Sequence, residues 1–512
     1  MREVPPRWAA TELGGVCKIV RGITFPASAK ISQEAEGYVC CLRTSNVQDA
    51  VDWNDIYFVP RQFVKREDQF VQPGDILMSM ANSYELVGKV AIATKLPMQS
   101  AFGAFLSVIR PLPGIDGKFL YYLLKTPYVQ SALRSGSSQT VNIANISVKT
   151  VSAIRVPIAP HNEQRRIAEK LDDVLSRVRA CRERLERVPE ILKRFREAVI
   201  EAAVSGRLTQ DWRERINADH SKTGAELATL SKLDHQVVGA GRAAALSTPD
   251  GVEQLREIPS TWGWISAAHI VEPGAEIVYG IVQPGPKLAS GVPYVRGMDI
   301  VDGNILVHQL LRTSEAIAKR YERASLKGGD ILLGIIRATK VAIVPDTLAG
   351  ANITQGTARL RPSRYIRTKY LALVLEAPLT QDWLHDCYRG IDMPGLNLAD
   401  VRRTPIPLPP LEEQDEIIRR AGGLLRRSER LDASSRSAIK TAGKLVPSLL
   451  RKAFRGKLVR QDPREEPAAE MLERMPATNR RGRSGTKAGR VTVSMSAPES
   501  RQAPLARKRR TA

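Results

Sequence analysis

The sequence predicts an α+β fold in which two tandem domains, each a mostly antiparallel sheet with helices, are separated by two long helices. Three observations support this prediction. A segment of about sixty residues occurs twice, the regions preceding the two copies resemble each other, and both copies carry apolar residues at coiled-coil spacing. The long helices are therefore expected to pack as an antiparallel coiled coil in a molecule with a pseudo-two-fold internal repeat.

The repeated segment begins near Ile154 and returns 250 residues later without a gap. This offset aligns Pro157, Pro160, Glu163, Gln164, Ile167, Gly206 and Leu208 with Pro407, Pro410, Glu413, Gln414, Ile417, Gly456 and Leu458. The period is far too long for a solenoid, in which each repeat is one small supersecondary unit. It indicates that a domain and its helix have been used twice.

The first long helix follows two prolines that favour an extended entry, and Gly206 is a natural stop. Pro189 is expected to kink the helix or to start a second one. The predicted seam consists of Ile167, Leu171, Val174, Val178, Cys181, Leu185, Val188, Leu192, Phe195 and Val199, in steps of four and three. So narrow a seam favours a partner helix, although packing on the helix's own domain is an alternative.

The second copy, from about Glu412 to Lys457, is the expected partner helix. Ser428, Ser435 and Ala438 weaken the middle of its seam. Glu163-Gln164 and Glu413-Gln414 recur at both helix starts, where they are expected to act as a structural cap or to dock a partner.

The regions that precede the helices contain short strand-like runs separated by turn signals, followed by a helix. Their correspondence places Trp262 against Trp8, Arg296 against Arg43, Asp330 against Asp75, Lys340 against Lys89 and Pro378 against Pro127. Shared scaffold positions with different residues between them are expected if one fold has been adapted to two ligands.

The remaining segments are poorly patterned, and they complete a division of the chain into six parts. The expected parts are a first domain (1–156), a first long helix (157–215), a linker with room for a short helix (216–256), a second domain (257–406), a second long helix (407–462) and a basic disordered tail (463–512). From Arg474 to the end, eleven basic residues face one acidic residue. This tail could contact phosphates or simply be a solvated extension.

The charge balance indicates a polyanionic partner. The formal net charge is +23 and the pI is near 10, which makes nucleic acid the first candidate for a soluble chain. No apolar run reaches eighteen residues, the first residues lack a signal-peptide core, and the five cysteines show no zinc spacing. These features predict a cytoplasmic protein that has no membrane partner.

Taken together, the repeated features resemble the specificity (S) subunit of type I restriction–modification systems. The most specific marks are the helix openings PIAPHNEQRRI and PLPPLEEQDEI, the endings SGRL and RGKL, and the doubled GDIL turns. The resemblance covers nearly everything up to about Asp462, whereas the basic tail and the long linker depart from it. It implies two target-recognition domains that each read one half of a bipartite, asymmetric DNA site.

The resemblance also implies the partners. The helices would act as a spacer and hold two modification (methyltransferase) subunits, and restriction subunits would complete the complex. S-adenosylmethionine, ATP and magnesium would bind those other subunits, so this chain is expected to bind no cofactor itself. Two domains on one rod are expected to contact DNA roughly 34 Å apart, about one helical turn.

The best candidates for DNA contact are polar residues in loops beside the repeated strands. In the first domain they are Arg43, Thr44, Asn46, Asn82, Ser83, Tyr84 and Lys89, with Gln139 and Thr140 as further possibilities. In the second domain they are Arg296, Asp299, Arg337, Thr339 and Lys340, with Asn352 and Gln355 in addition. Arg43 and Arg296 are equivalent, so either can equally be scaffold. Residues 82–84 differ from their counterparts, which favours specificity.

The sequence contains no recognisable catalytic centre. It lacks methyltransferase motifs, a phosphate-binding loop and a nuclease carboxylate cluster, and its six histidines are scattered. We therefore expect a non-catalytic chain with no metal site. Two alternatives remain at this point: a stand-alone DNA methyltransferase or nuclease with unrecognised motifs, and an architectural binding protein.

Overall fold

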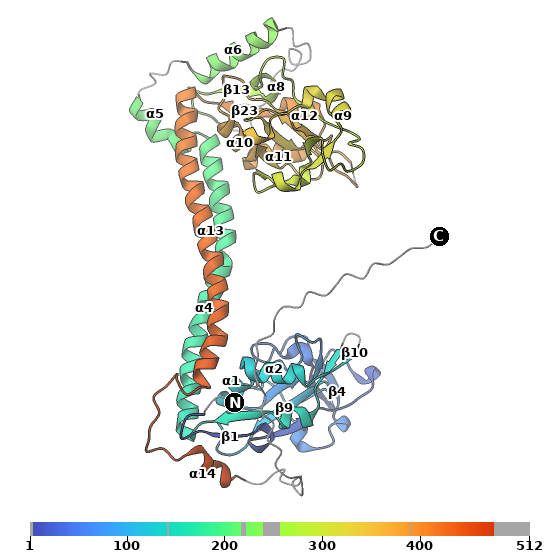
Figure 1. Cartoon of the computed structure of the whole chain (residues 1–512), viewed down its shortest axis with the longest axis vertical. Helices are drawn as coiled ribbons and strands as arrows, with labels where there is room; N and C mark the ends of the chain where they lie inside the picture. The colour runs from blue at the N-terminus through green and yellow to red at the C-terminus, as the bar shows by residue number, and fades with distance from the viewer. Residues whose placement is uncertain (1–3, 141–142, 217–221, 239–256, 391, 476–512) are drawn as a thin grey trace, which may run out of the picture. The chain divides into compact units, whose positions relative to one another are not determined.

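The computed structural model describes residues 4–140, 143–216, 222–238, 257–390 and 392–475 (Figure 1). The described residues form two compact units, of which the first comprises those within 4–178 and 443–475 and the second comprises those within 179–442. Each unit contains one sheet domain and one end of each long helix.

The sheet domain of the first unit is mostly antiparallel, as predicted. Its four-stranded sheet has the order β2 (Cys17–Arg21), β9 (Leu106–Pro111), β5 (Ile76–Ser79) and β7 (Val90–Ile92). A three-stranded sheet contains β4 (Tyr57–Pro60), β3 (Tyr38–Leu42) and β8 (Ser100–Phe102), in which β3 and β8 run parallel. Strand β1 (Ala9–Glu12) pairs with β12 (Arg155–Ile158), immediately before the first long helix.

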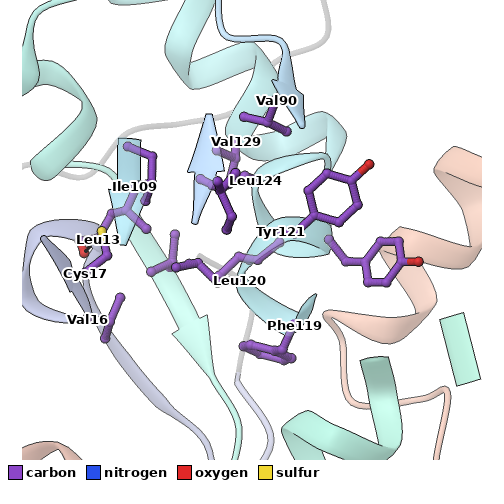
Figure 2. Close-up of a cluster of buried hydrophobic side chains, with 14 of the residues drawn as sticks. Leu13, Val16, Cys17, Val90, Ile109, Phe119, Leu120, Tyr121, Leu124 and Val129 are labelled. Atoms are coloured by element: carbon purple, nitrogen blue, oxygen red, sulfur yellow. Dashed lines mark hydrogen bonds between the residues drawn. The ribbon is translucent and has the colours of Figure 1, made fainter. Parts of the chain in front are cut away.

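Helices α1 (Gly117–Leu124), α2 (Pro127–Ser135) and α3 (Val148–Ser152) complete this domain. Asp116 and Thr126 cap the first two through their side chains, which accept hydrogen bonds from Phe119 N and Val129 N. Figure 2 shows part of the resulting core, in which Phe119 and Leu120 of α1 belong to the same buried cluster as Ile109 of β9.

The second unit repeats this topology. Its four-stranded sheet has the order β14 (Val278–Tyr279), β22 (Thr357–Leu360), β19 (Ile331–Gly334) and β20 (Val341–Ile343). Its three-stranded sheet contains β18 (Leu311–Thr313), β15 (Val292–Val295) and β21 (Asn352–Ile353). Two further strand pairs are β13 (Gly263–Ser266) with β23 (Pro405–Leu408) and β16 (Ile300–Val301) with β17 (Asn304–Ile305). The helices of this sheet domain include α8 (Ala267–Ile270), α9 (Glu315–Arg320), α10 (Thr368–Glu376), α11 (Pro378–Asp386) and α12 (Leu398–Arg403).

The doubled GDIL turn has the same structural role in both domains. Asp75 accepts two hydrogen bonds from Arg110, at 2.7 and 2.6 Å, and Asp330 accepts two from Arg361, both at 2.8 Å. Both carboxylates are buried and also accept a bond from the backbone of their own turn. The repeated aspartates are therefore scaffold, which agrees with their shared positions.

The two long helices are α4 (His161–Val204) and α13 (Leu411–Ala453). In the first unit Ile167 and Leu171 of α4 pack in one cluster with Leu450, and in the second unit Val199 packs in one cluster with Ala421. The helices therefore run antiparallel, as predicted (Figure 1). Helix α4 continues through Pro189, so the prediction that a second helix starts there is wrong.

Small residues form the seam of α13. Ala421, Ser428, Ser435 and Ala442 recur every seven residues and are buried, and Ser435 Oγ donates to Leu185 O at 3.3 Å. The serines that weaken the apolar pattern thus lie at the helix contact, where short side chains let two backbones approach closely. Two residues predicted for the seam of α4, Cys181 and Phe195, are exposed instead.

A repeated polar cluster fixes the start of each long helix. Trp8 Nε1 donates to Glu163 Oε2 at 3.0 Å, and Trp262 Nε1 donates to Glu413 Oε2 at 2.8 Å. Gln164 and Gln414 each accept a hydrogen bond from a backbone amide of the sheet domain, at 2.9 and 2.7 Å. All four helix residues are buried, so they anchor the helix to its own domain rather than dock a partner.

The second polar cluster has more contacts than the first. Glu413 Oε1 also accepts from Thr209 Oγ1 at 2.7 Å and forms an ion pair with Arg213. Glu163 forms no ion pair with a described residue, and burial raises the pKa of its carboxyl.

The expected linker and the expected disordered tail each contain a helix. Helix α6 (Gly224–Val237) lies in the expected linker, and α14 (Ala468–Glu473) lies in the expected disordered tail. Gly224 N donates to Thr261 O at 2.8 Å and Ala468 N donates to Arg7 O at 2.9 Å, next to the two repeated tryptophans. The two helices are therefore equivalent.

Both helices bury apolar residues in the core of a sheet domain, Leu227 from α6 and Met471 from α14. This burial explains why they are ordered despite weak periodicity, and it corrects the predicted linker and the tail prediction for residues 463–475. The rest of the predicted tail, 476–512, lies outside the described residues.

The repeated glycines that follow the long helices are required by their backbone conformation and by close contact with a proline. Gly206 and Gly456 have φ of +77° and +67°. A Cβ atom at Gly206 would lie 2.5 Å from Pro259 Cγ, and one at Gly456 would lie 2.5 Å from Pro5 Cγ. Each glycine thus permits a left-handed turn and close packing against the first residues of a sheet domain.

Candidate nucleic-acid interface

In the first domain, a small sheet brings two predicted loops together. Strands β10 (Ser138–Thr140), β11 (Ile143–Asn145) and β6 (Ala81–Asn82) are antiparallel neighbours, and Ala144 is paired with both Gln139 and Asn82. Asn82 therefore lies two strands from Gln139. The adjoining Tyr84 is exposed, as is Ile143 in the central strand.

A third predicted loop reaches the same region through Lys89. Lys89 Nζ donates to Gln48 Oε1 at 2.5 Å, which joins the segment after Asn46 to the segment after Asn82. Asn82 is only lightly held, because its amide donates to Ser79 Oγ at 3.3 Å and accepts from Ser83 N at 2.9 Å. Thr44 and Ser83 are half-buried.

The side chains of Arg43 and Asn46 stabilise the loop that contains them. Arg43 donates to Tyr57 Oη at 2.5 Å, pairs with Asp55 and lies over the Tyr57 ring. Asn46 is buried, accepts from Arg43 N at 2.9 Å and donates to the carbonyls of Asp52 and Asn54. An amide bonded in this way has no free donor for a base edge, so its predicted DNA contact is not supported by its position.

The equivalent pair in the second domain is also bonded internally. Arg296 donates to Asp299 from Nε at 2.9 Å and from Nη2 at 2.7 Å, and Asp299 is buried. Asp299 Oδ2 accepts from Arg296 N as well, at 2.8 Å. Since Arg43 and Arg296 make equivalent turns through different contacts, the scaffold role applies to both.

The loop after β19 is the counterpart of the loop after β6. Ile336 and Arg389 are both bridged to Gly395, as Asn82 and Gln139 are both paired to Ala144. The predicted residue Arg337 follows Ile336 directly, and its backbone N donates to Pro394 O at 2.8 Å. Homologous surfaces of the two domains therefore carry different side chains.

Arg337 has the features of a recognition residue. It is exposed, and its guanidinium bonds to no other described residue. Its φ of +66° is rare for a residue other than glycine, and such strain concentrates at functional positions.

Other predicted residues of the second domain are held by internal contacts. Thr339 Oγ1 donates to Gln381, and Lys340 Nζ donates to Ile300 O at 3.0 Å. Asn352 is buried and donates to Tyr321 O at 3.1 Å, which makes it scaffold. Gln355 is exposed and bonds through its side chain to no described residue.

Sequence reasoning missed several exposed residues of these loops. They are Phe105 beside β6, Ile143 in β11, and Arg389 and Met393 in the segment bridged to Ile336. Arg389 occupies the position of Gln139, but the two segments share no sequence motif by which they could have been aligned.

Across the described ranges, no helix is both long enough and apolar enough to cross a bilayer. The same residues contain no group of three or more His, Cys, Asp or Glu side chains placed to hold a metal ion.

Comparison with known proteins identifies the relatives of this chain. A family model described as the type I restriction modification DNA specificity domain matches residues 5–190 and 286–421. The EcoBI specificity subunit of Escherichia coli is 32% identical over 73% of this chain and 74% of its own length. The EcoKI specificity subunit of Escherichia coli K12 is 28% identical over 95% of this chain and 98% of its own length.

Solved structures share the fold. The HsdS subunit from Thermoanaerobacter tengcongensis gives a TM-score of 0.55 at 17% identity, covering 89% of this chain and 98% of that one. A chain from a structure of type I R-M complex assembly gives a TM-score of 0.55 at 18% identity, covering 89% of this chain and all of that one.

Proposed function

The chain belongs to the type I restriction modification DNA specificity family, and from this premise we propose that its two domains read separate halves of one asymmetric DNA site. As a specificity subunit it is the sequence-recognition component of such a system and not its catalytic component. The observation that carries the proposal is the pair of homologous loop surfaces, of which one presents Asn82 and Tyr84 and the other presents Arg337.

The two surfaces suit different bases. An amide such as that of Asn82 can donate to and accept from adenine, whereas the guanidinium of Arg337 fits the two acceptors of guanine. Each domain then needs to read only a few base pairs, because mismatch costs of about 1–3 kcal/mol add across well-separated positions. Thr44, Ser83 and Lys89 are proposed to support contact in the first domain, as Thr339 and Lys340 are in the second.

The long helices are proposed to set the gap between the half-sites. A heptad inserted at matching positions, after Leu185 in α4 and after Ser435 in α13, keeps the seam in register and adds about 10 Å. We expect the gap to lengthen by about three base pairs at about 3.4 Å each, with both half-sites unchanged. Methylation mapping of the variant in cells measures the gap.

Insertion of the heptad into α4 alone is the matched control. It puts the two helices out of register and is expected to abolish methylation. Half-sites that change while the gap stays constant would contradict the role of the helices.

The helices are also proposed to bind two modification subunits. Ile191 and Phe195 lie one turn apart on α4 and are 63% and 39% exposed, which is costly unless a partner covers them. We expect Ile191→Glu with Phe195→Glu to weaken modification-subunit binding at least 100-fold, since central apolar anchors dominate such interfaces. Calorimetric titration measures the loss, and Arg194→Glu between them is the control that should retain binding.

The remaining components are assigned to other chains. S-adenosylmethionine, ATP and magnesium are proposed to bind the modification and restriction subunits. The full complex with restriction subunits would then use this chain only to locate DNA.

A further inference from the structure

A cavity of about 550 Å³ lies beside the Arg337 loop in the second domain. Its walls come from β14, the segment after β19, and α12. Ile336 and Leu396 belong to these walls. Ile336 is bridged to Gly395, the residue before Leu396, and this bridge positions the neighbouring Arg337 and Pro394. The cavity therefore opens next to the loops that are proposed to read the second half-site.

Several of the polar side chains that line this cavity form no hydrogen bond or ion pair with another described residue. Arg323, Gln355 and Tyr279 are exposed there, and none of their side chains forms a hydrogen bond or ion pair with another described residue. Arg402 also lines it and donates to Ile277 O at 2.8 Å. Glu276 is the acidic residue of the lining, so arginine charge predominates.

A buried arginine lies next to the wall of the cavity. Arg359 is 2% exposed, and strand pairing sets it beside Val278, a lining residue, on the same face of the sheet. Its Nη2 donates to Glu276 O at 2.9 Å, whereas its Nε and Nη1 have no partner among the described residues. Thr357, two residues earlier on that face, has a buried hydroxyl that is likewise unpartnered.

The first domain shows that the fold does not need these polar groups. In its sheet, Val108 is paired with Val20 and Leu77, as Arg359 is paired with Val278 and Leu332. The position of Thr357 is taken by Leu106. A buried charge is costly and a buried polar group without a partner calls for an explanation, so a function specific to the second domain is indicated.

We propose that this cavity binds a backbone phosphate of the DNA strand beside the second half-site. The proposal rests on the function proposed above and adds to it the position of a phosphate contact. Arg323 and Gln355 contact the phosphate from the open side. Arg359 is a positioning residue: it holds the Glu276 carbonyl in the wall and adds a positive field, which is weakly screened because the group is buried.

The test measures the salt dependence of DNA binding by the full chain in complex with its modification subunits. The probe is a DNA duplex that carries the sequence motif identified by methylation mapping. Arg323→Gln is expected to reduce the slope of log affinity against log salt by about 1, the change for one lost phosphate contact. Arg320→Gln removes the same charge from α9 outside the cavity and is expected to leave the slope unchanged.

Arg359→Val introduces the residue found at this position in the first domain. We expect about tenfold weaker binding with no fall in Tm, because an apolar residue that replaces a buried ion is often neutral or stabilising. Arg359→Lys restores a cation and should recover part of the affinity. If Arg359→Val lowers both Tm and affinity and Arg359→Lys restores neither, the positioning role is overturned.

A neutral methylphosphonate, scanned along the duplex, locates the contact. One position should weaken the wild-type complex but not Arg323→Gln, since that variant has already lost the contact. If the wild-type complex binds its motif and Arg323→Gln keeps the wild-type slope of log affinity against log salt, the cavity proposal is overturned while the proposed function stands. Absence of sequence-specific binding by the wild-type complex would instead contradict the proposed function.

Discussion

Replacing Glu413 with alanine is expected to destabilise the second unit by about 3–5 kcal/mol, the cost of breaking a buried ion pair. Glu413 is fully buried and accepts hydrogen bonds from Trp262, Thr209 and Arg213, which come from two segments of the chain. Its removal leaves the indole N–H without an acceptor and a mostly buried guanidinium without its carboxylate partner. Calorimetric unfolding measures the effect as a shift of the transition of that unit.

Glu163 is the matched control in the first unit. Its carboxylate accepts from the Trp8 indole, its Oε1 has no partner among the described residues, and no ion pair is lost on substitution. Glu163→Ala is therefore expected to cost only about 1–3 kcal/mol. Glu163→Gln should cost less, because burial already raises the pKa of this carboxyl and the amide oxygen can still accept from Trp8. Equal losses from Glu163→Ala and Glu413→Ala would contradict this account of the two clusters.

Arg337→Gly is expected to relax recognition at one base pair of one half-site. The lost discrimination should be about 1–3 kcal/mol, the usual contribution of a bidentate arginine–guanine contact. Glycine accepts the φ of +66° at this position, so the variant removes the side chain without strain and should not lower stability. Methylation mapping with the variant would show a degenerate position, while the other half-site and the gap stay as in the wild type.

Arg296→Ala is the control for this prediction. Arg296 is bonded to Asp299 through two nitrogens, so its loss should lower Tm and leave the motif unchanged. If Arg296→Ala alters the motif and Arg337→Gly does not, the assignment of scaffold and reader is reversed.

The architecture could be predicted from the sequence because the repeat is long and free of gaps. Trp8, Glu163 and Gly206 each have a counterpart in the second half. Each tryptophan donates to the glutamate at the start of a long helix, and each glycine packs against a proline. For helix α6 the sequence predicted no more than a short helix without bounds in the linker, because its periodicity is weak. Thr223 and Glu226 form a capping box that could have located its start from their spacing.

The interface was less accessible to sequence reasoning because it depends on turn geometry. Arg43 and Arg337 look alike in the sequence, yet one is bonded within its own loop and the other is free in solvent. Asn46 is buried because a short helical turn directs its amide inward, a feature that no motif reports. Arg359 becomes conspicuous only when the strand registers of the two domains show that Val108 is its equivalent in the first.

Methylation mapping at base resolution tests the central claim most directly. The chain is co-expressed with its modification subunit, once unchanged and once with residues 257–406 replaced by the equivalent domain of a relative. The account predicts a bipartite, asymmetric motif with a fixed gap, of which only one half changes in the exchanged chain. A soluble and associated complex that methylates no motif, or an exchange that alters both halves, would contradict it.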